Sequence, residues 1–301
     1  MNTSKSQLSV GVIGLGAMGN GMATSVRRAG YSPFVFDLRS EIAQAFAKDG
    51  GTACASLSAL GQECDVVVSV VVNAVQTESV LFGQEGCAAT MKPGSVFVMC
   101  STVDPNWSVA LEAKLAALGI LYMDAPISGG AAKAASGQMT MMTAGKPEAY
   151  AVAEPILNAM AAKVYKLGDS AGAGSKVKII NQLLAGVHIA AAAEAMALGL
   201  REGVNPDALY EVITNSAGNS WMFENRMAHV LAADYTPLSA VDIFVKDLGI
   251  VLDMARATKF PLPLSSTAHQ MFMQASTAGF AKEDDSAVIK IFPGIELPQK
   301  K

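Results

Sequence analysis

The sequence predicts two domains: a doubly wound α/β domain with a parallel sheet over residues 1–167, and an all-α domain over residues 168–301. The length of 301 residues suits two domains at roughly 150 residues each. Short apolar runs alternate with amphipathic segments in the first half, as in a sheet whose strands are joined by helices. After residue 167 these runs give way to helical patterns, and the first, at about residues 175–203, is expected to join the domains.

The apolar runs that predict strands lie at residues 8–13, 33–37, 65–72, 95–99 and 120–124. Between them, residues 17–29 and 105–118 have the apolar spacing of helices. The run at 65–72 is almost continuous valine, which is typical of a strand buried on both faces of a parallel sheet. We therefore expect right-handed strand–helix–strand units.

Helical patterns fill the second half, at residues 176–203, 206–216, 220–231, 239–257 and 263–279. The first is apolar enough to raise the question of a membrane span. It carries Lys178, Asn181, Gln182, His188 and Glu194, which are costly in lipid. We therefore expect a helix buried within protein and no membrane partner.

Composition and charge argue against several classes of protein. The chain has 26 acidic and 22 basic residues, a net charge of −4, which argues against a nucleic-acid partner. With 51% hydrophobic and 16% charged residues, it is not a disordered chain. The cysteines, Cys54, Cys64, Cys87 and Cys100, have neither disulfide nor zinc-site spacing. We interpret them as buried thiols of a cytoplasmic protein and expect no metal.

The segment Gly14-Leu15-Gly16-Ala17-Met18-Gly19 follows a predicted strand and begins a predicted helix. In this setting it is a dinucleotide-binding motif. The first glycine allows a tight turn, the second lets a pyrophosphate approach the backbone, and the third lets helix and strand pack closely. The amides at the start of the helix would bind the phosphates.

Asp37 ends the second predicted strand, 18 residues after Gly19. A carboxylate there can accept hydrogen bonds from the adenosine ribose and would repel the 2′-phosphate of NADP, so the sequence favours NAD. Arg39 is the counter-argument, because a guanidinium at this position could pair with that phosphate.

Two further segments carry side chains suited to catalysis. Ser128, Gly129 and Gly130 follow a predicted strand, where a hydroxyl and exposed amides could bind a carboxylate; a plain glycine turn is the alternative. Lys178 and Asn181 are three residues apart and so share one helix face. Lys178 lies beside a long apolar run, as a catalytic acid or base would, although a solvated lysine at a helix start has the same local pattern.

The ordered motifs together resemble the β-hydroxyacid dehydrogenase family over essentially the whole chain. They lie at residues 11–19, 124–130, 172–181 and 246–248. The resemblance implies a Rossmann domain, a long interdomain helix and an α-helical domain, with NAD(P) and a hydroxy acid bound between the domains.

The resemblance also implies roles for single residues. Lys178 would be the catalytic acid/base, Ser128 with Gly129 would bind the substrate carboxylate, and Asn181 would orient the substrate. The remaining implied cofactor contacts are Val72, Asn73, Thr102 and Lys246, with Thr102 on the nicotinamide side. The chain departs from the family at Val72-Asn73, where many members have Leu-Pro, and at Gly21, where many have Pro; the second change is expected to affect only the helix start.

Residues 217–226, 242–248 and 282–289 resemble the subgroup of this family that oxidises L-threonate. This implies NAD-dependent oxidation of the C2 hydroxyl to 2-oxo-tetronate, and a homodimer or homotetramer is expected. The polar side chains Asn219, Ser220 and Asn225 suit a substrate with several hydroxyls. The alternatives are a tartronate semialdehyde reductase, a 3-hydroxyisobutyrate dehydrogenase and an inactive nucleotide-binding scaffold; the presence of Lys178 argues against the last.

Overall fold

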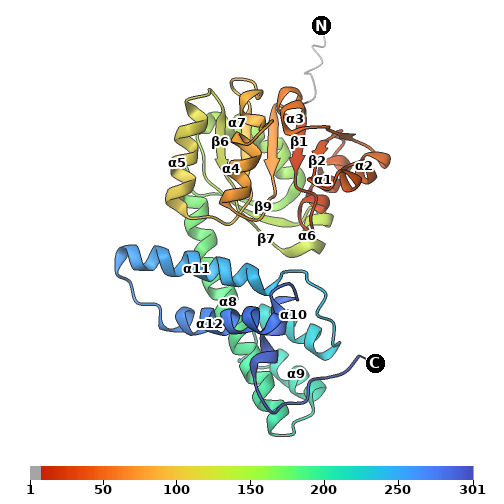
Figure 1. Ribbon diagram of the computed structural model, residues 1–301, viewed down its shortest axis with the longest axis vertical. Helices are drawn as coiled ribbons and strands as arrows, with labels where there is room; N and C mark the ends of the chain where they lie inside the picture. Colours follow the sequence, from red (N-terminus) through yellow and green to blue (C-terminus); the bar gives the residue numbers. More distant parts are fainter. Residues whose placement is uncertain (1–7, 301) are drawn as a thin grey trace. The chain divides into compact units, whose positions relative to one another are not determined.

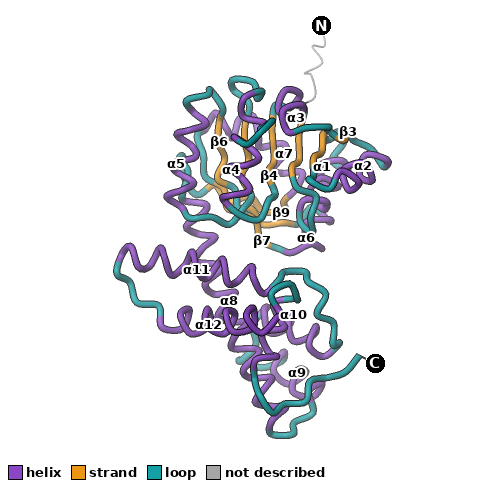
Figure 2. Tube along the Cα trace, viewed as in Figure 1, coloured by secondary structure: helices purple, strands orange, loops and turns teal. Residues whose placement is uncertain are grey.

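The computed structural model describes residues 8–300, and the chain divides into two compact units, residues 1–178 and residues 179–301. Each unit has its own hydrophobic core. Figures 1 and 2 show a sheet with helices in the first unit and helices in the second. The predicted fold class, a doubly wound α/β domain followed by an all-α domain, is confirmed.

The first unit is built on a six-stranded parallel sheet with the order β3-β2-β1-β4-β5-β6. Its strands are β1 (Val10–Ile13), β2 (Phe34–Phe36), β3 (Thr52–Ala53), β4 (Val66–Ser69), β5 (Val96–Met99) and β6 (Leu121–Asp124). Each of the five predicted strands is present and is shorter than its apolar run. The strand order reverses between β1 and β4. Strands β2 and β3 are added on one side of β1, and strands β4 to β6 are added on the other side.

Helices cover both faces of this sheet: α1 (Gly19–Arg28), α2 (Ser40–Lys48), α3 (Leu57–Glu63), α4 (Ala74–Phe82), α5 (Pro105–Ala116) and α7 (Pro147–Met160). Alternate strand residues point to opposite faces. Val68 and Val98 therefore join a core with Met22 of α1 and Ile156 of α7, whereas Val67 joins a second core with helices α3, α4 and α5. Burial on both faces explains the continuous valine run.

A second, three-stranded sheet was not predicted from the sequence. It consists of β7 (Ile127–Ser128), β8 (Met139–Thr143) and β9 (Ala161–Lys166), with β7 antiparallel and β9 parallel to β8. The short helix α6 (Gly130–Ser136) connects β7 to β8. A bridge between Asp124 and Ala144 joins the end of β6 to the residue after β8. This sheet holds Ser128 in place at the start of the glycine pair.

The packing of α6 corrects one expectation. A side-chain carbon at Gly21 would lie 2.6 Å from the backbone nitrogen of Ala135 and 2.9 Å from the Cβ of Ala134. Gly21 therefore lets α1 and α6 pack closely. The glycine at this position therefore affects this contact as well as the helix start, to which the expectation had been limited.

The second unit continues α8 (Ala173–Arg201) and adds α9 (Pro206–Thr214), α10 (Trp221–Leu231), α11 (Val241–Thr258) and α12 (Pro263–Ala275). Short helical segments follow at Ser276–Phe280 and Asp285–Ile291, and residues 179–300 contain no β-strand. The five predicted helices are present. The largest difference in a boundary is at the end of α12, residue 275 instead of 279, because the chain turns at Gly279 with a φ of 100°.

Helix α8 is 29 residues long, and by length and composition it could cross a membrane. Half of its most apolar stretch is buried inside the structure. The core helix of a soluble protein has the same two properties. We therefore describe α8 as the central helix of the second unit, whose buried face includes Ile189, Ala193 and Met196.

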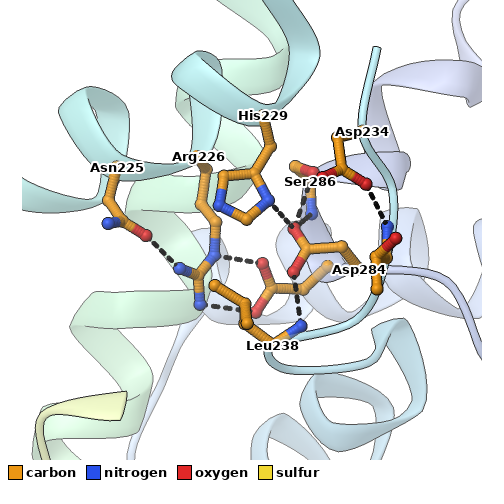
Figure 3. A network of polar contacts seen from close by, with 9 residues as sticks. Asn225, Arg226, His229, Asp234, Leu238, Asp284 and Ser286 are labelled. Carbon is orange, nitrogen blue, oxygen red and sulfur yellow. Dashed lines mark hydrogen bonds and ion pairs between the residues drawn. The ribbon is translucent and has the colours of Figure 1, made fainter. Parts of the chain in front are cut away.

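A buried polar cluster in the second unit lies between α10 and residues 284–286 (Figure 3). The guanidinium of Arg226 in α10 forms an ion pair with Asp285. Burial raises the pKa of Asp285 to about 6, although Arg226 acts in the opposite direction. The neighbouring Asp284 accepts hydrogen bonds from the Ser286 hydroxyl at 2.7 Å and the Leu238 amide at 3.1 Å. This cluster attaches the C-terminal segment to α10.

Candidate active site

The predicted site residues of the first unit lie at one edge of the large sheet. All six strands are parallel, so the loops after β1, β2, β4, β5 and β6 leave the sheet at their shared carboxyl edge. Ligands bind at this edge in doubly wound folds, next to the point where the chain reverses direction. The residues gathered there are Gly14, Leu15, Gly16, Ala17, Met18, Gly19, Asp37, Val72, Asn73, Thr102, Ser128, Gly129 and Gly130.

The three motif glycines have three different environments. Gly14 has a φ of 87°, and a side-chain carbon there would lie 2.9 Å from the carbonyl oxygen of Val70. A side-chain carbon at Gly19 would lie 1.8 Å from the carbonyl oxygen of Gly14, whereas one at Gly16 would meet no atom within 4 Å. Gly16 therefore leaves open space beside its backbone, and α1 begins next to it. This arrangement fits a pyrophosphate.

Asp37 organises the glycine loop. Its Oδ2 accepts a hydrogen bond from the Leu15 amide at 2.8 Å, and its Oδ1 accepts one from the Arg39 amide at 3.0 Å. Arg39 also places its Nε 3.3 Å from Oδ1. Burial opposes ionisation of Asp37, but the amides of Arg39 and Leu15 and the Arg39 guanidinium outweigh it and hold the pKa below its ordinary value. Asp37 is therefore a carboxylate at neutral pH, and Arg39 is engaged with it.

A hydrogen bond joins the loop after β4 to the loop after β5. The Ser101 hydroxyl donates to the carbonyl of Val71 at 2.7 Å, next to the half-buried Thr102. Asn73 Oδ1 accepts from the Gln76 amide at 2.9 Å and so caps α4. This capping role gives a physical reason for an asparagine at this position. Val72 is half exposed.

Ser128 ends β7, and two glycines with unusual backbone angles follow. Gly129 has a φ of 140° and Gly130 a φ of 76°, a region that other residues rarely adopt. A side-chain carbon at Gly130 would meet no atom within 4 Å. Ser128 therefore directly precedes a backbone turn with open space at Gly130, which suits a small anion.

Lys178 lies in the second turn of α8 and is buried, with 7% of its surface exposed. The helix begins at Ala173, three residues before the predicted start. The reason is the carboxylate of Asp124, which accepts hydrogen bonds from the amides of Gly172 and Ser175 at 2.8 and 2.9 Å. Sequence reasoning missed this role of Asp124, although the residue stands in the 124–130 motif.

In the second unit a chain of side chains links two predicted site residues. Asn181 donates to Gln182 Oε1 at 3.1 Å, and Gln182 donates to Asp247 Oδ2 at 2.6 Å. Asp247 is buried and also forms an ion pair with Lys246. Asn181 and Lys246 are therefore brought together through Gln182 and Asp247, neither of which the sequence analysis assigned to the site.

Asn219 and Ser220 lie together before α10. The Ser220 hydroxyl accepts from the Phe223 amide at 3.0 Å and caps the helix. Asn219 donates to the Thr214 carbonyl at 3.1 Å, and its Oδ1 is buried without a hydrogen-bond partner among residues 8–300. Asn225 lies in α10 and accepts from Arg226, so its oxygen is already used within the polar cluster.

The glycine loop lies where the strand order reverses, and a carboxylate follows β2; together they define a dinucleotide-binding protein of the Rossmann type. Residues 9–168 match the NAD binding domain of 6-phosphogluconate dehydrogenase, and residues 172–292 match the NAD-binding domain of NADP-dependent 3-hydroxyisobutyrate dehydrogenase. The chain belongs to the β-hydroxyacid dehydrogenase family, whose members include the 3-hydroxyisobutyrate dehydrogenases, and it is an NAD-binding dehydrogenase.

Named relatives cover nearly the whole chain. This chain is 69% identical over 291 residues to the L-threonate dehydrogenase of Cupriavidus necator. The aligned region covers 97% of this chain and 98% of the relative. This chain is 53% identical over 298 residues to the L-threonate dehydrogenase of Escherichia coli K12, with 98% of each chain covered. A crystal structure described as 3-hydroxyisobutyrate dehydrogenase from Salmonella typhimurium matches with a TM-score of 0.91 at 54% identity, covering 95% of this chain and 100% of that one.

Proposed function

We propose that this protein oxidises the C2 hydroxyl of L-threonate to 2-oxo-tetronate with NAD as the hydride acceptor. The observation that carries the proposal is the set of relatives, 52 to 69% identical over nearly their full length, that are named L-threonate dehydrogenase. Formation of NADH on addition of L-threonate, with product identification, tests it.

The glycine loop and Asp37 supply the cofactor contacts in this proposal. The backbone at Gly16 and the first turn of α1 bind the pyrophosphate, and Asp37 accepts hydrogen bonds from the adenosine ribose. Val72, Asn73, Thr102 and Lys246 are the further proposed cofactor contacts, with Thr102 on the nicotinamide side. When bound, the nicotinamide ring supplies the hydride acceptor.

The substrate contacts follow from the chemistry of each group. Ser128 and the amides of Gly129 and Gly130 bind the substrate carboxylate, while Asn181 orients the substrate. Lys178, as a neutral amine, takes the proton from the C2 hydroxyl during oxidation, and as an ammonium it returns it during reduction. Asn219 and Ser220 are the proposed partners of the remaining hydroxyls.

Oxidation of 3-hydroxyisobutyrate is the second candidate. It is favoured by the description of the Salmonella structure, which is 54% identical to this chain. The polar segment at Asn219 and Ser220 is the observation against it, because an aliphatic substrate would offer no hydroxyl to the Asn219 oxygen, which has no hydrogen-bond partner among the described residues.

Asp37→Ser should increase the use of NADP relative to NAD. The change removes the charge that repels the 2′-phosphate and releases Arg39 to pair with it. We expect the ratio of kcat/KM for NADP to that for NAD to rise by about tenfold or more, roughly 1.4 kcal/mol. The double variant Asp37→Ser/Arg39→Ala should lose most of the gain. Comparable efficiency of the unmodified protein with both cofactors would contradict the assignment of Asp37.

We further propose a homodimer or homotetramer. Three apolar side chains of α8, Ile180, Leu184 and Leu198, are 51 to 61% exposed and lie on one side of the helix. Apolar patches of this kind mark association surfaces. Light scattering should give the mass of two or four chains, and Leu198→Glu should lower it. A monomer at micromolar concentration would contradict this proposal.

The proposed location is the cytoplasm, and the proposed partners are the cofactor, a small-molecule hydroxy acid and further copies of this chain. Cys64, Cys87 and Cys100 are buried and Cys54 is half buried, and all four are free thiols. Free thiols suit a reducing compartment. Fractionation of cells that express the protein tests the location.

A further inference from the structure

The carboxylate of Asp124 is buried at the end of β6 and is bonded to the start of α8. Its Oδ2 accepts from the amides of Gly172 and Ser175, and its Oδ1 accepts from the Ser175 hydroxyl at 2.7 Å. A carboxylate that accepts hydrogen bonds at a helix N-terminus also interacts favourably with the helix dipole. One side chain therefore satisfies three donors at the point where α8 begins.

The first turn of α8 is also held by close packing of its backbone at Gly174. A side-chain carbon at Gly174 would lie 2.4 Å from the carbonyl oxygen of Met142 and 2.9 Å from that of Asp124. The helix start therefore lies directly against the ends of β6 and β8. Its first turn cannot move toward the sheet without a clash.

Lys178 lies on the face of α8 that this turn presents. It follows Gly174 by four residues and Ser175 by three, and residues at these spacings share a face. Helical side chains lean toward the N-terminus, so Lys178 extends over the turn that Asp124 caps. The location of its amino group therefore depends on the location of that turn.

Asp124 also holds the segment that leads to Ser128. Its backbone amide donates to the Ala144 carbonyl at 2.9 Å, and its carbonyl accepts from the Ala144 amide at 2.8 Å. β7, with Ser128 as its last residue, begins three residues further on. Asp124 is thus bonded by its backbone to the sheet beside the Ser128 loop and by its side chain to the Lys178 helix.

We propose that Asp124 is a positioning residue that fixes the amino group of Lys178 relative to the Ser128–Gly130 loop. The proposal rests on the proposed function, in which that loop binds the substrate carboxylate and Lys178 takes the hydroxyl proton. Because Asp124 acts through Lys178, it contributes to kcat and leaves cofactor binding unchanged.

Asp124→Ala tests the proposal together with Asp124→Asn. The alanine variant should lose kcat by about tenfold or more, because small displacements of a catalytic group are costly, with an unchanged KM for NAD. The asparagine variant should recover to within about threefold of the unmodified protein. Its oxygen can accept from both amides, and its NH2 group can donate to the Ser175 oxygen.

The matched control is Asp104→Ala. Asp104 caps α5 by accepting from the amides of Asn106 and Trp107 at 2.7 and 3.0 Å, so the same kind of helix cap is removed elsewhere in the same unit. This variant should lose thermal stability without losing kcat. Equal losses of kcat in Asp104→Ala and Asp124→Ala, an unchanged kcat in folded Asp124→Ala, or no recovery in Asp124→Asn would each overturn the proposal.

Hydrogen exchange tests the anchoring without any assay of activity. In the unmodified protein the amides of Gly172 and Ser175 should exchange as slowly as those in the interior of α8. Exchange as fast as at a frayed helix end would overturn the proposal even if no Asp124 variant folds. If the unmodified protein oxidises neither L-threonate nor 3-hydroxyisobutyrate, the proposed function fails, and slow exchange would still support the anchoring.

Discussion

Lys178→Ala should lower kcat by at least about 10²-fold, the lower end for loss of a positioned acid or base. The side chain is buried in the second turn of α8, and a water molecule that fills the space left by alanine is a much weaker base than an amine. Cofactor binding should be retained, because the glycine loop follows β1 and Asp37 follows β2, and neither depends on this helix. Stopped-flow measurement of NADH formation, with NAD binding measured by fluorescence titration, checks both parts.

Lys176→Ala is the matched control for this prediction. Lys176 is an exposed lysine on the same helix, two residues away. Its removal changes the net charge equally and should leave kcat within about twofold, as for a surface substitution. A small primary amine added to Lys178→Ala should restore part of the rate, because alanine leaves space where the amine was. A near-normal rate in Lys178→Ala would show that another group moves the proton.

The parts of the site that could be predicted are those determined within a few residues. Gly14, Gly16 and Gly19 act through their own backbone, so the motif alone indicated a tight turn, an open approach and a close packing. Asp37 follows a strand that its apolar run predicts. Its position after β2 could therefore be predicted from that run and from its distance of 18 residues from Gly19. Amphipathic helices in the second half were found in the same way.

The parts that could not be predicted depend on distant partners. Asp124 and Gly172 are 48 residues apart, and Gln182 and Asp247 are 65 apart, so no local pattern indicates either hydrogen bond. The start of α8 differs by three residues from the predicted start for this reason, since its cap comes from the end of β6. β7 has two residues and β8 is rich in methionine, and such short or mixed runs lack the period that predicts a strand.

These long-range hydrogen bonds separate two groups of residues: those proposed to contact ligands and those that hold the contacting residues in place. The proposed cofactor contacts of the first unit lie in the glycine loop and after strand ends, where the sequence indicates them. Residues that hold those groups in place, such as Asp124 and Asp247, are buried acids whose role depends on the fold. A variant that spares every motif residue can therefore still alter the proposed chemistry.

The largest expected difference is between two substrates. L-threonate should be oxidised with a kcat/KM about 10⁴-fold higher than that of 3-hydroxyisobutyrate, the range for a site that hydrogen-bonds substrate hydroxyls. The proposed reason is Asn219, whose Oδ1 is covered by protein and has no hydrogen-bond partner among the described residues. We propose that its side chain rotates when substrate binds, so that Oδ1 accepts from a substrate hydroxyl. Without that hydroxyl the oxygen stays unpaired, at a cost of about 1–3 kcal/mol for each such group.

Asn219→Ala should reduce this discrimination by lowering the efficiency for L-threonate by about tenfold or more while leaving that for 3-hydroxyisobutyrate within about threefold. Asn215→Ala is the control, because Asn215 is an exposed asparagine of the same segment that donates to the Glu211 carbonyl at 2.8 Å. Efficient oxidation of 3-hydroxyisobutyrate with none of L-threonate would refute the proposed substrate. Oxidation of L-threonate at C3, identified from the product, would keep the substrate but refute the placement of Lys178 at the C2 hydroxyl.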